Sequence, residues 1–288
     1  MEINMLVGRK SYQCDLIFRV TDIVMEHGRE VAILYGEDYR LVADAYLDDL
    51  VPISTEERSE KQSVLEKLEQ QTFQSLQQSV EDKHSLSTQG KRNEFKLFQI
   101  PGRVLHLDGD ASYLNKCIQL YEQLGVTVYG VHCNEKHMHE HIPQLLKQYR
   151  PDILVITGHD AYSKSKGEKV DLEAYRHSKY FVQTVMEARR ETPHLDQLII
   201  FAGACQSHFE SLILAGANYA SSPQRVNIHA LDPVYIVAKV CFTHFMDKIH
   251  IWDVLQHTIT GEKGIGGLES KGVLRVGMPY EAINKETE

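Results

Sequence analysis

The sequence of 288 residues has few cysteines, and they are scattered. Five are present, at Cys14, Cys117, Cys133, Cys205 and Cys241, and no two of them form a C-x-x-C pair. Their odd number and wide spacing argue against a disulfide scaffold and against a zinc ribbon. We therefore expect the protein to work in a reducing compartment.

Long hydrophobic runs are also missing. No stretch approaches the roughly 18 apolar residues that cross a membrane, and residues 1–15 hold no apolar run of signal-peptide length. These absences predict a soluble intracellular protein without a membrane span.

Positive charge is in deficit. The chain has 31 Lys and Arg against 40 Asp and Glu, which gives a formal net charge of −9. An excess of acidic residues makes nucleic acid a poor candidate for a partner. The chain is long enough to bury a large core without disulfides or metals.

The first 97 residues predict two accessory parts. In residues 1–53, short apolar runs such as DLIFRV and EVAILYG alternate with turn signals, as in a small β-barrel or meander. Residues 54–97 are rich in Glu, Gln, Lys and Ser, with leucines at helical spacing. This composition predicts a solvated helix followed by an exposed linker.

Residues 98–288 predict an α/β catalytic domain. Near-continuous apolar runs are typical of buried parallel strands. The predicted strands are 103–109, 126–132, 152–159 and 197–205, with a short fifth at 218–221. Apolar residues at helical spacing after Asp110 and Asp171, and a helix start at Asp232-Pro233, predict helices between and after the strands. The expected fold is a mostly parallel sheet with helices on both faces.

Candidate catalytic residues stand at two strand ends, where parallel sheets bind ligands. ITGHD ends the third predicted strand and IIFAGACQS ends the fourth, which places His159 and Cys205 at the same edge. A thiolate attacks acyl groups, and a nearby imidazole lowers the pKa of the thiol and protonates the leaving amine. A lone cysteine at a strand end is more often a small buried hydrophobe. The pairing with GHD favours catalysis.

The same two motifs predict the groups around the reacting carbonyl. The backbone N–H of Cys205 and one N–H from the turn Gly158–Asp160 are the expected oxyanion hole. The carboxylate of Asp160 is a further candidate for orienting the imidazole.

Both motifs resemble those of the caspase-like cysteine peptidases, in which one strand ends in His-Gly and another in Ala-Cys or Asp-Cys. The sequence departs from that pattern because glycine precedes His159, and because Gly203 and Ser207 flank Ala-Cys. A closer resemblance extends over nearly the whole chain, to the YabG family of sporulation-specific peptidases. The segments that carry it are VGRKSYQCDLIFRV, PDILVITGHDAY, IIFAGACQSHFESLILAGANYASSP and KGIGGLESKGVLRVGMP.

The resemblance implies a caspase-like cysteine endopeptidase with Cys205 and His159 as its catalytic pair. It implies cleavage after arginine, processing of spore-coat and spore-morphogenesis proteins, and self-processing. The implied location is the mother-cell cytoplasm of a sporulating bacterium and the coat and cortex region of the spore. No cofactor and no metal are implied, and oligomerisation stays open.

Cleavage after arginine requires carboxylates in the S1 pocket, which binds the residue before the cleaved bond. The end of the first strand contributes to S1 in caspase-like folds, so Asp108 and Asp110 in LHLDGDASY are the predicted substrate-binding residues. Asp110 fits a helix cap equally well. The exposed basic residues of the linker are Arg58, Lys91 and Arg92, and self-cleavage is predicted at an arginine in or near it.

Two other functions remain open from the sequence. One is a non-catalytic coat-assembly or scaffolding protein, and the other is a flavodoxin-like nucleotide or flavin binder, since doubly wound sheets host many functions. His137 and His141 are spaced like zinc ligands, but VHCNEKHMHEHIP lacks the H-E-x-x-H order. That segment favours a solvated helix start over a metal site.

Overall fold

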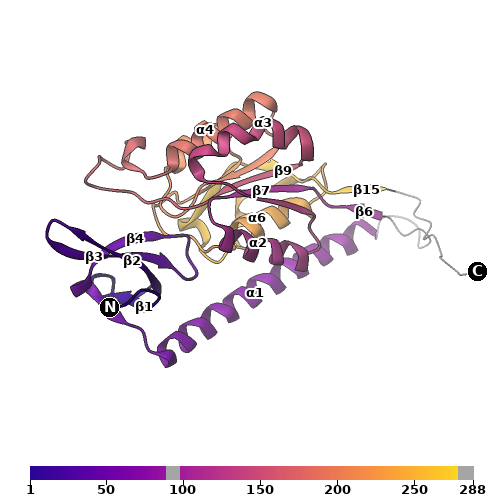
Figure 1. The fold of residues 1–288 in the computed structure, drawn as a ribbon. Helices are drawn as coiled ribbons and strands as arrows, with labels where there is room; N and C mark the ends of the chain where they lie inside the picture. The colour runs from indigo at the N-terminus through magenta and orange to yellow at the C-terminus, as the bar shows by residue number, and fades with distance from the viewer. Residues whose placement is uncertain (89–97, 278–288) are drawn as a thin grey trace, which may run out of the picture.

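A computed structural model describes residues 1–88 and 98–277 of the chain (Figure 1). An antiparallel sheet comes first, a long helix follows, and a larger α/β part surrounds a mostly parallel sheet (Figure 1). The first sheet lies beyond the carboxyl ends of the parallel strands, so it faces the predicted catalytic edge.

The first sheet has five antiparallel strands in the order β4-β3-β2-β1-β5. The strands are β1 (Leu6–Arg9), β2 (Phe18–Glu26), β3 (Arg29–Gly36), β4 (Val42–Tyr46) and β5 (Leu50–Pro52). His27 and Gly28 join β2 to β3 with φ values of 49° and 78°, as tight hairpins require. Since β4 and β5 are the two edges of this order, the pairings in the described part of the chain do not confirm a barrel.

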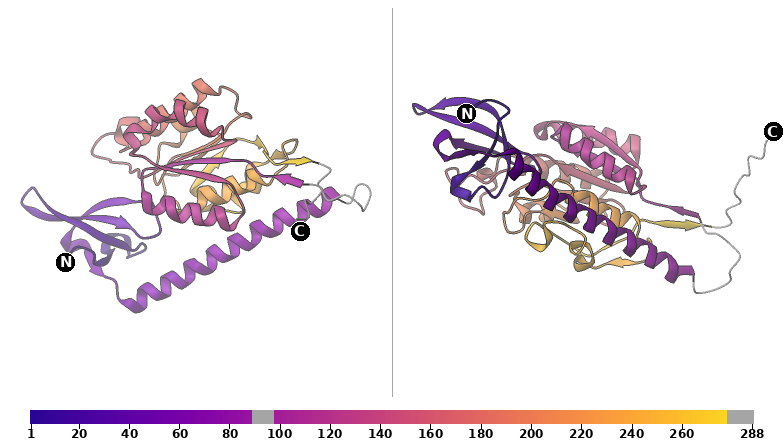
Figure 2. Two further views of the ribbon diagram at one scale, coloured as in Figure 1. Left: turned by 45° about the vertical axis from the view of Figure 1, so that its right-hand side comes forward. Right: turned by 90° about the horizontal axis from the view of Figure 1, so that it is seen from below.

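Helix α1 (Thr55–Thr88) follows the first sheet and runs along the α/β part (Figure 2). It begins with a capping box, in which Glu57 N donates to Ser54 Oγ and Ser54 N donates to Glu57 Oε2, both at 3.1 Å. Leu76 is its most deeply buried side chain among those described. The predicted helix is therefore present, and its remaining face is solvated as its polar composition requires.

The second sheet has six strands in the order β13-β11-β10-β9-β7-β8, and β13 alone is antiparallel to its neighbour within this sheet. The strands are β7 (Val104–Asp108), β8 (Val128–His132), β9 (Ile153–Thr157), β10 (Ile199–Ala202), β11 (Tyr219–Ser221) and β13 (Ile265–Gly267). The five predicted strands are confirmed, including the short fifth one.

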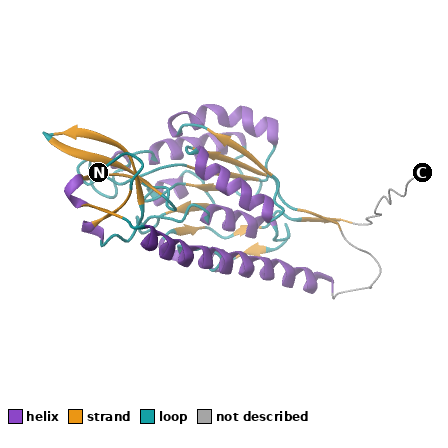
Figure 3. Cartoon of the chain, turned by 60° about the horizontal axis from the view of Figure 1, so that its bottom comes forward, coloured by secondary structure: helices purple, strands orange, loops and turns teal. Residues whose placement is uncertain are grey.

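Helices cover both faces of this sheet, as predicted (Figure 3). Successive strand residues point to opposite faces, so Val104 joins the core beneath α2 (Ala111–Gln123) and α6 (Asp232–Cys241), whereas Leu105 joins the other core. That second core lies beneath α3 (Met138–Tyr149), α4 (Ser178–Glu191) and α5 (Phe209–Leu214).

Two short ribbons and a helix complete the α/β part. The strand β6 (Phe98–Ile100) pairs with β15 (Arg275–Gly277), and β12 (Lys248–Ile249) pairs with β14 (Ser270–Lys271). Helix α7 is Ile251–Leu255. Across residues 1–88 and 98–277, no helix has both the length and the apolarity to cross a bilayer.

Candidate active site

The two candidate catalytic residues occupy equivalent positions on adjacent strands. Ile156 of β9 is in register with Ala202 of β10, and each strand reaches its candidate, His159 or Cys205, three residues later. Neighbouring strands lie about 4.8 Å apart, so thiol and imidazole belong to one edge of the sheet. Between the two side chains, the described part of the chain has no hydrogen bond.

The thiol of Cys205 is closed off from solvent. Its Sγ accepts from the backbone N of Ile228 at 3.3 Å and lies 3.7 Å from the carbonyl oxygen of the same residue. Burial raises the pKa of Cys205 to about 12, although the Ile228 N–H and the Arg40 guanidinium oppose that rise. In this state the thiol is therefore protonated and inaccessible.

A strained turn presents Cys205 at the strand end. Gly203 has a φ of 110° and Gln206 a φ of 56°, both in the left-handed region. A Cβ on residue 203 would lie 2.9 Å from Leu212 Cδ1. The glycine that departs from the caspase pattern is thus required by this backbone. Among the described residues, the N–H of Cys205 has no acceptor.

The imidazole of His159 lies between two carboxylates. Its Nδ1 is 3.8 Å from Glu135 Oε1, and its Nε2 is 3.4 Å from Asp110 Oδ2. Nε2 is buried and makes no hydrogen bond within the described residues. The ring packs against Tyr35 of the first sheet, with centroids 5.3 Å apart. The imidazole is therefore enclosed by Asp110, Glu135 and the first sheet.

Glu135 is a site residue that the sequence analysis missed. Its Oε1 accepts from His159 N at 2.9 Å and lies 3.7 Å from His177 Nδ1. Burial acts to raise the pKa of Glu135, but hydrogen bonds from His159 outweigh it and the pKa is lowered overall. Glu135 follows β8 in the segment interpreted as a solvated helix start. Its place just beyond a parallel strand was the signal available.

Asp160 does not contact the imidazole among the described interactions. Its carboxylate accepts from His177 N at 2.8 Å, from Ser207 Oγ at 3.0 Å, and from the Ser178 hydroxyl. Burial raises its pKa. Asp160 therefore ties the loop after β9 to the start of α4, and Glu135 is the carboxylate beside His159 Nδ1.

The two predicted S1 carboxylates have different partners. Asp108 is fully buried and pairs with the Arg40 guanidinium, while Thr157 Oγ1 donates to it at 2.9 Å. Burial opposes the ionisation of Asp108, but the Arg40 charge prevails and lowers its pKa overall. Asp110 caps α2 by accepting from the backbone N of Ser112 at 2.8 Å. Asp108 thus binds a guanidinium, and Asp110 is the helix cap that reaches His159.

A family model described as YabG peptidase U57 matches residues 2–279. The chain belongs to this family. The sporulation-specific protease YabG of Bacillus subtilis (strain 168) is 54% identical over 286 residues, which cover 98% of this chain and 99% of that protein. The resemblance seen in the sequence is confirmed. Membership makes the chain a peptidase, and the name of its relative supports a role in sporulation.

A cavity of about 610 Å³ in this YabG-family chain adjoins the candidate nucleophile. It lies between the first sheet and the loops that follow β9 and β10. Its lining includes Leu41, Val42, Tyr162, Gln206 and Asn227. Gln206 directly follows Cys205, so the cavity reaches the neighbour of the candidate nucleophile, although Cys205 itself is buried behind it.

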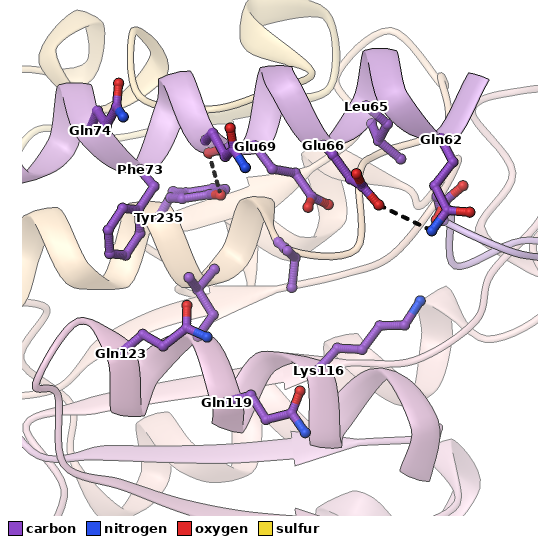
Figure 4. Close-up of a pocket in the computed structure, with 14 residues that line it drawn as sticks. Gln62, Leu65, Glu66, Glu69, Phe73, Gln74, Lys116, Gln119, Gln123 and Tyr235 are labelled. Carbon is purple, nitrogen blue, oxygen red and sulfur yellow. Dashed lines mark hydrogen bonds between the residues drawn. The ribbon is translucent and has the colours of Figure 1, made fainter. Parts of the chain in front are cut away.

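A second hollow of about 460 Å³ lies between α1 and α2 (Figure 4). Amide and carboxylate side chains such as Gln62, Glu66 and Gln119 line it, together with Lys116 (Figure 4). Among its described lining residues there is neither cysteine nor histidine. This hollow therefore lacks the thiol and imidazole that a cysteine peptidase needs.

Residues that could hold a metal do not gather in the structure. Within residues 1–88 and 98–277, no group of three His, Cys, Asp or Glu side chains is arranged to bind an ion. His137 instead lies 3.3 Å from Glu140 on the surface.

Glycine at position 158 makes room for Glu135. A Cβ there would lie 2.5 Å from Glu135 Oε1. Gly158→Ala is expected to displace this carboxylate and the imidazole beside it, and to lower kcat/KM for peptide cleavage about 100-fold, as small displacements in an active site do. Gln148→Ala is the control because this side chain is exposed on α3. Equal activity of the two variants would contradict the role of Glu135.

Proposed function

We propose that this chain is a cysteine endopeptidase that cleaves proteins after arginine. The observation that carries the proposal is the register of β9 and β10, which brings His159 and Cys205 to equivalent positions at one sheet edge. The pairing of Asp108 with a guanidinium supports arginine as the residue before the cleaved bond.

The proposed reaction begins when His159 takes the proton of the Cys205 thiol. The thiolate attacks the scissile carbonyl, the C–N bond breaks, and His159 gives the proton to the leaving amine. Water then hydrolyses the thioester with His159 as base. Glu135 holds the Nδ1 side of the ring during both steps.

The oxyanion is proposed to bind the N–H of Cys205 and a second N–H from the turn Gly158–Asp160. The N–H of His159 in that turn already donates to Glu135. The second donor is therefore the N–H of Gly158 or of Asp160.

A caspase-like fold is part of the proposal. Support comes from the strand order, with the thiol and the imidazole following neighbouring parallel strands of the sheet. Doubly wound nucleotide binders share this general architecture, so the sheet alone does not select a function. Family membership favours the peptidase over the nucleotide binder and over the scaffolding protein.

The proposed substrates are spore-coat and spore-morphogenesis proteins, processed in the mother cell and in the coat and cortex region. The sporulation-specific name of the Bacillus subtilis relative supports this setting. Self-processing at a linker arginine remains a prediction. Arg58 lies in the first turn of α1, 3.5 Å from Glu37, and Lys91 and Arg92 lie outside the described residues.

Two reagents test the proposal. One is a peptide library in which the amino acid before the cleaved bond is varied through every type, and the other is an arginyl chloromethyl ketone. The wild type should cut after arginine and carry the label on Cys205, whereas Cys205→Ala should do neither. Cys241→Ala is the matched control, because Cys241 is equally buried and donates to Gly102 O instead. Undiminished cleavage by Cys205→Ala, or a label on another cysteine, would overturn the assignment.

A further inference from the structure

Arg40 belongs to the first sheet but lies inside the α/β part. It stands in the connection between β3 and β4, and its side chain is fully buried against Asp108. Its Nη2 lies 3.2 Å from Cys117 Sγ and 3.4 Å from Ala230 O. Its guanidinium lies 5.1 Å from the centroid of the Tyr113 ring. One connecting loop thus places an arginine on the predicted S1 carboxylate.

The backbone before Arg40 pairs with the segment that holds the thiol. Tyr39 forms an antiparallel bridge with His229, and Ala230 N donates to Asp38 O at 3.2 Å. Ile228, one residue before this bridge, donates its N–H to Cys205 Sγ. Peptide ligands bind in the same way when they add a strand to an exposed backbone edge.

The backbone after Arg40 continues past the nucleophile. Leu41 and Val42 line the cavity of about 610 Å³ together with Gln206 and Asn227. Residues 39–42 therefore pair first with His229, then place Arg40 on Asp108, and then lie beside Gln206, the residue after Cys205. A substrate cleaved after arginine would follow the same order.

We propose that Arg40 occupies, within the same chain, the place of a substrate's arginine, so that the first sheet blocks the active site until it is displaced. This inference rests on the proposed function. It accounts for the complete burial of Cys205 and for the packing of Tyr35 on His159.

The hydrogen bonding of the Arg40 guanidinium is incomplete, which favours its replacement by the arginine of a substrate. Its Nε is buried without a hydrogen-bond partner among the described residues. Asp108 keeps other donors without Arg40, because Thr157 Oγ1 and Asp110 N both donate to it at 2.9 Å. A substrate arginine would therefore find this carboxylate already oriented.

The test compares full-length wild type with Arg40→Ala and Arg40→Gln on an arginyl peptide. If the first sheet blocks the site, only the fraction of molecules with the sheet displaced is active, and the apparent activity is reduced to that fraction. Both variants should therefore raise kcat/KM on the order of tenfold or more. Arg40→Gln retains an amide donor for Asp108 and serves if the alanine variant fails to fold. The matched control is Arg19→Ala, which removes a half-exposed ion pair with Glu37 in the same sheet and should leave kcat/KM unchanged.

Agmatine, which carries the guanidinium of arginine, probes the vacated pocket without catalysis. It should raise the melting temperature of Arg40→Ala/Cys205→Ala and leave that of Cys205→Ala unchanged. A purely structural ion pair predicts the opposite sign of the kinetic effect, because breaking it would lower activity.

Two results would separate this inference from the proposed function. Folded Arg40 variants with unchanged or reduced kcat/KM, while Cys205→Ala abolishes cleavage, would overturn the blocking role and leave the peptidase assignment intact. Agmatine binding by the double variant, with cleavage that persists in Cys205→Ala, would support the occupancy of the pocket and overturn the cysteine mechanism.

Discussion

Asp108→Ala is expected to lower the free energy of unfolding by about 3–5 kcal/mol, the cost of leaving a buried charge without its partner. Asp108 and Arg40 are both fully buried, so solvent cannot replace the lost carboxylate. Urea unfolding followed by circular dichroism measures the change. The variant should also lose cleavage after arginine if Asp108 forms the S1 pocket.

Asp48→Ala is the control. Asp48 pairs with Arg29 at 2.9 Å, both side chains are more than half exposed, and such surface pairs contribute about 0–1 kcal/mol. The folded state lowers the pKa of Asp108, so its stabilisation is present above the unfolded pKa of about 3.9 and is lost as the pH falls below it. As the pH is lowered through the acid range, the free energy of unfolding should therefore fall less steeply in Asp108→Ala than in the wild type. Equal losses in the two variants would contradict the assignment.

His159→Ala is expected to lower kcat/KM on an arginyl peptide about 1,000-fold, within the range that general acid–base catalysis supplies. The reason is that His159 follows β9, the strand whose register with β10 brings it to the position equivalent to Cys205. Steady-state kinetics at several pH values measure the loss.

His250→Ala is the control for that substitution. His250 is exposed and pairs with Glu269 at 2.8 Å, away from the sheet edge. It should keep wild-type kinetics. A His159→Ala variant that retains activity within tenfold of the wild type would remove His159 from the mechanism.

Most of the fold could be predicted because buried parallel strands are continuous apolar runs. The strand β13 could not, since Ile265 is flanked by glycines and forms no such run. Its glycines are needed for pairing, because a Cβ on Gly267 would lie 2.7 Å from Tyr219 Cδ1. Close approach of two backbones leaves no apolar signal in the sequence.

The candidate site was predicted from residues that follow the strands. His159, Cys205 and Asp108 each stand at or just beyond the end of a parallel strand. Glu135 and Arg40 were missed, because their partners are 24 and 68 residues away along the chain. Only the order of the strands brings such distant side chains together.

The first sheet and α1 lie in residues 1–88, and the α/β part that holds Asp108 begins at Phe98. The ribbon of β6 and β15 ties down the start of that part. A cut between residues 88 and 98 would leave the Arg40–Asp108 contact unbroken, but it would end the high effective concentration that a tether provides. Whether the severed fragment, which contains the first sheet and α1, stays bound then depends on the protein concentration. Cleavage of the chain and release of the fragment are therefore two separate events.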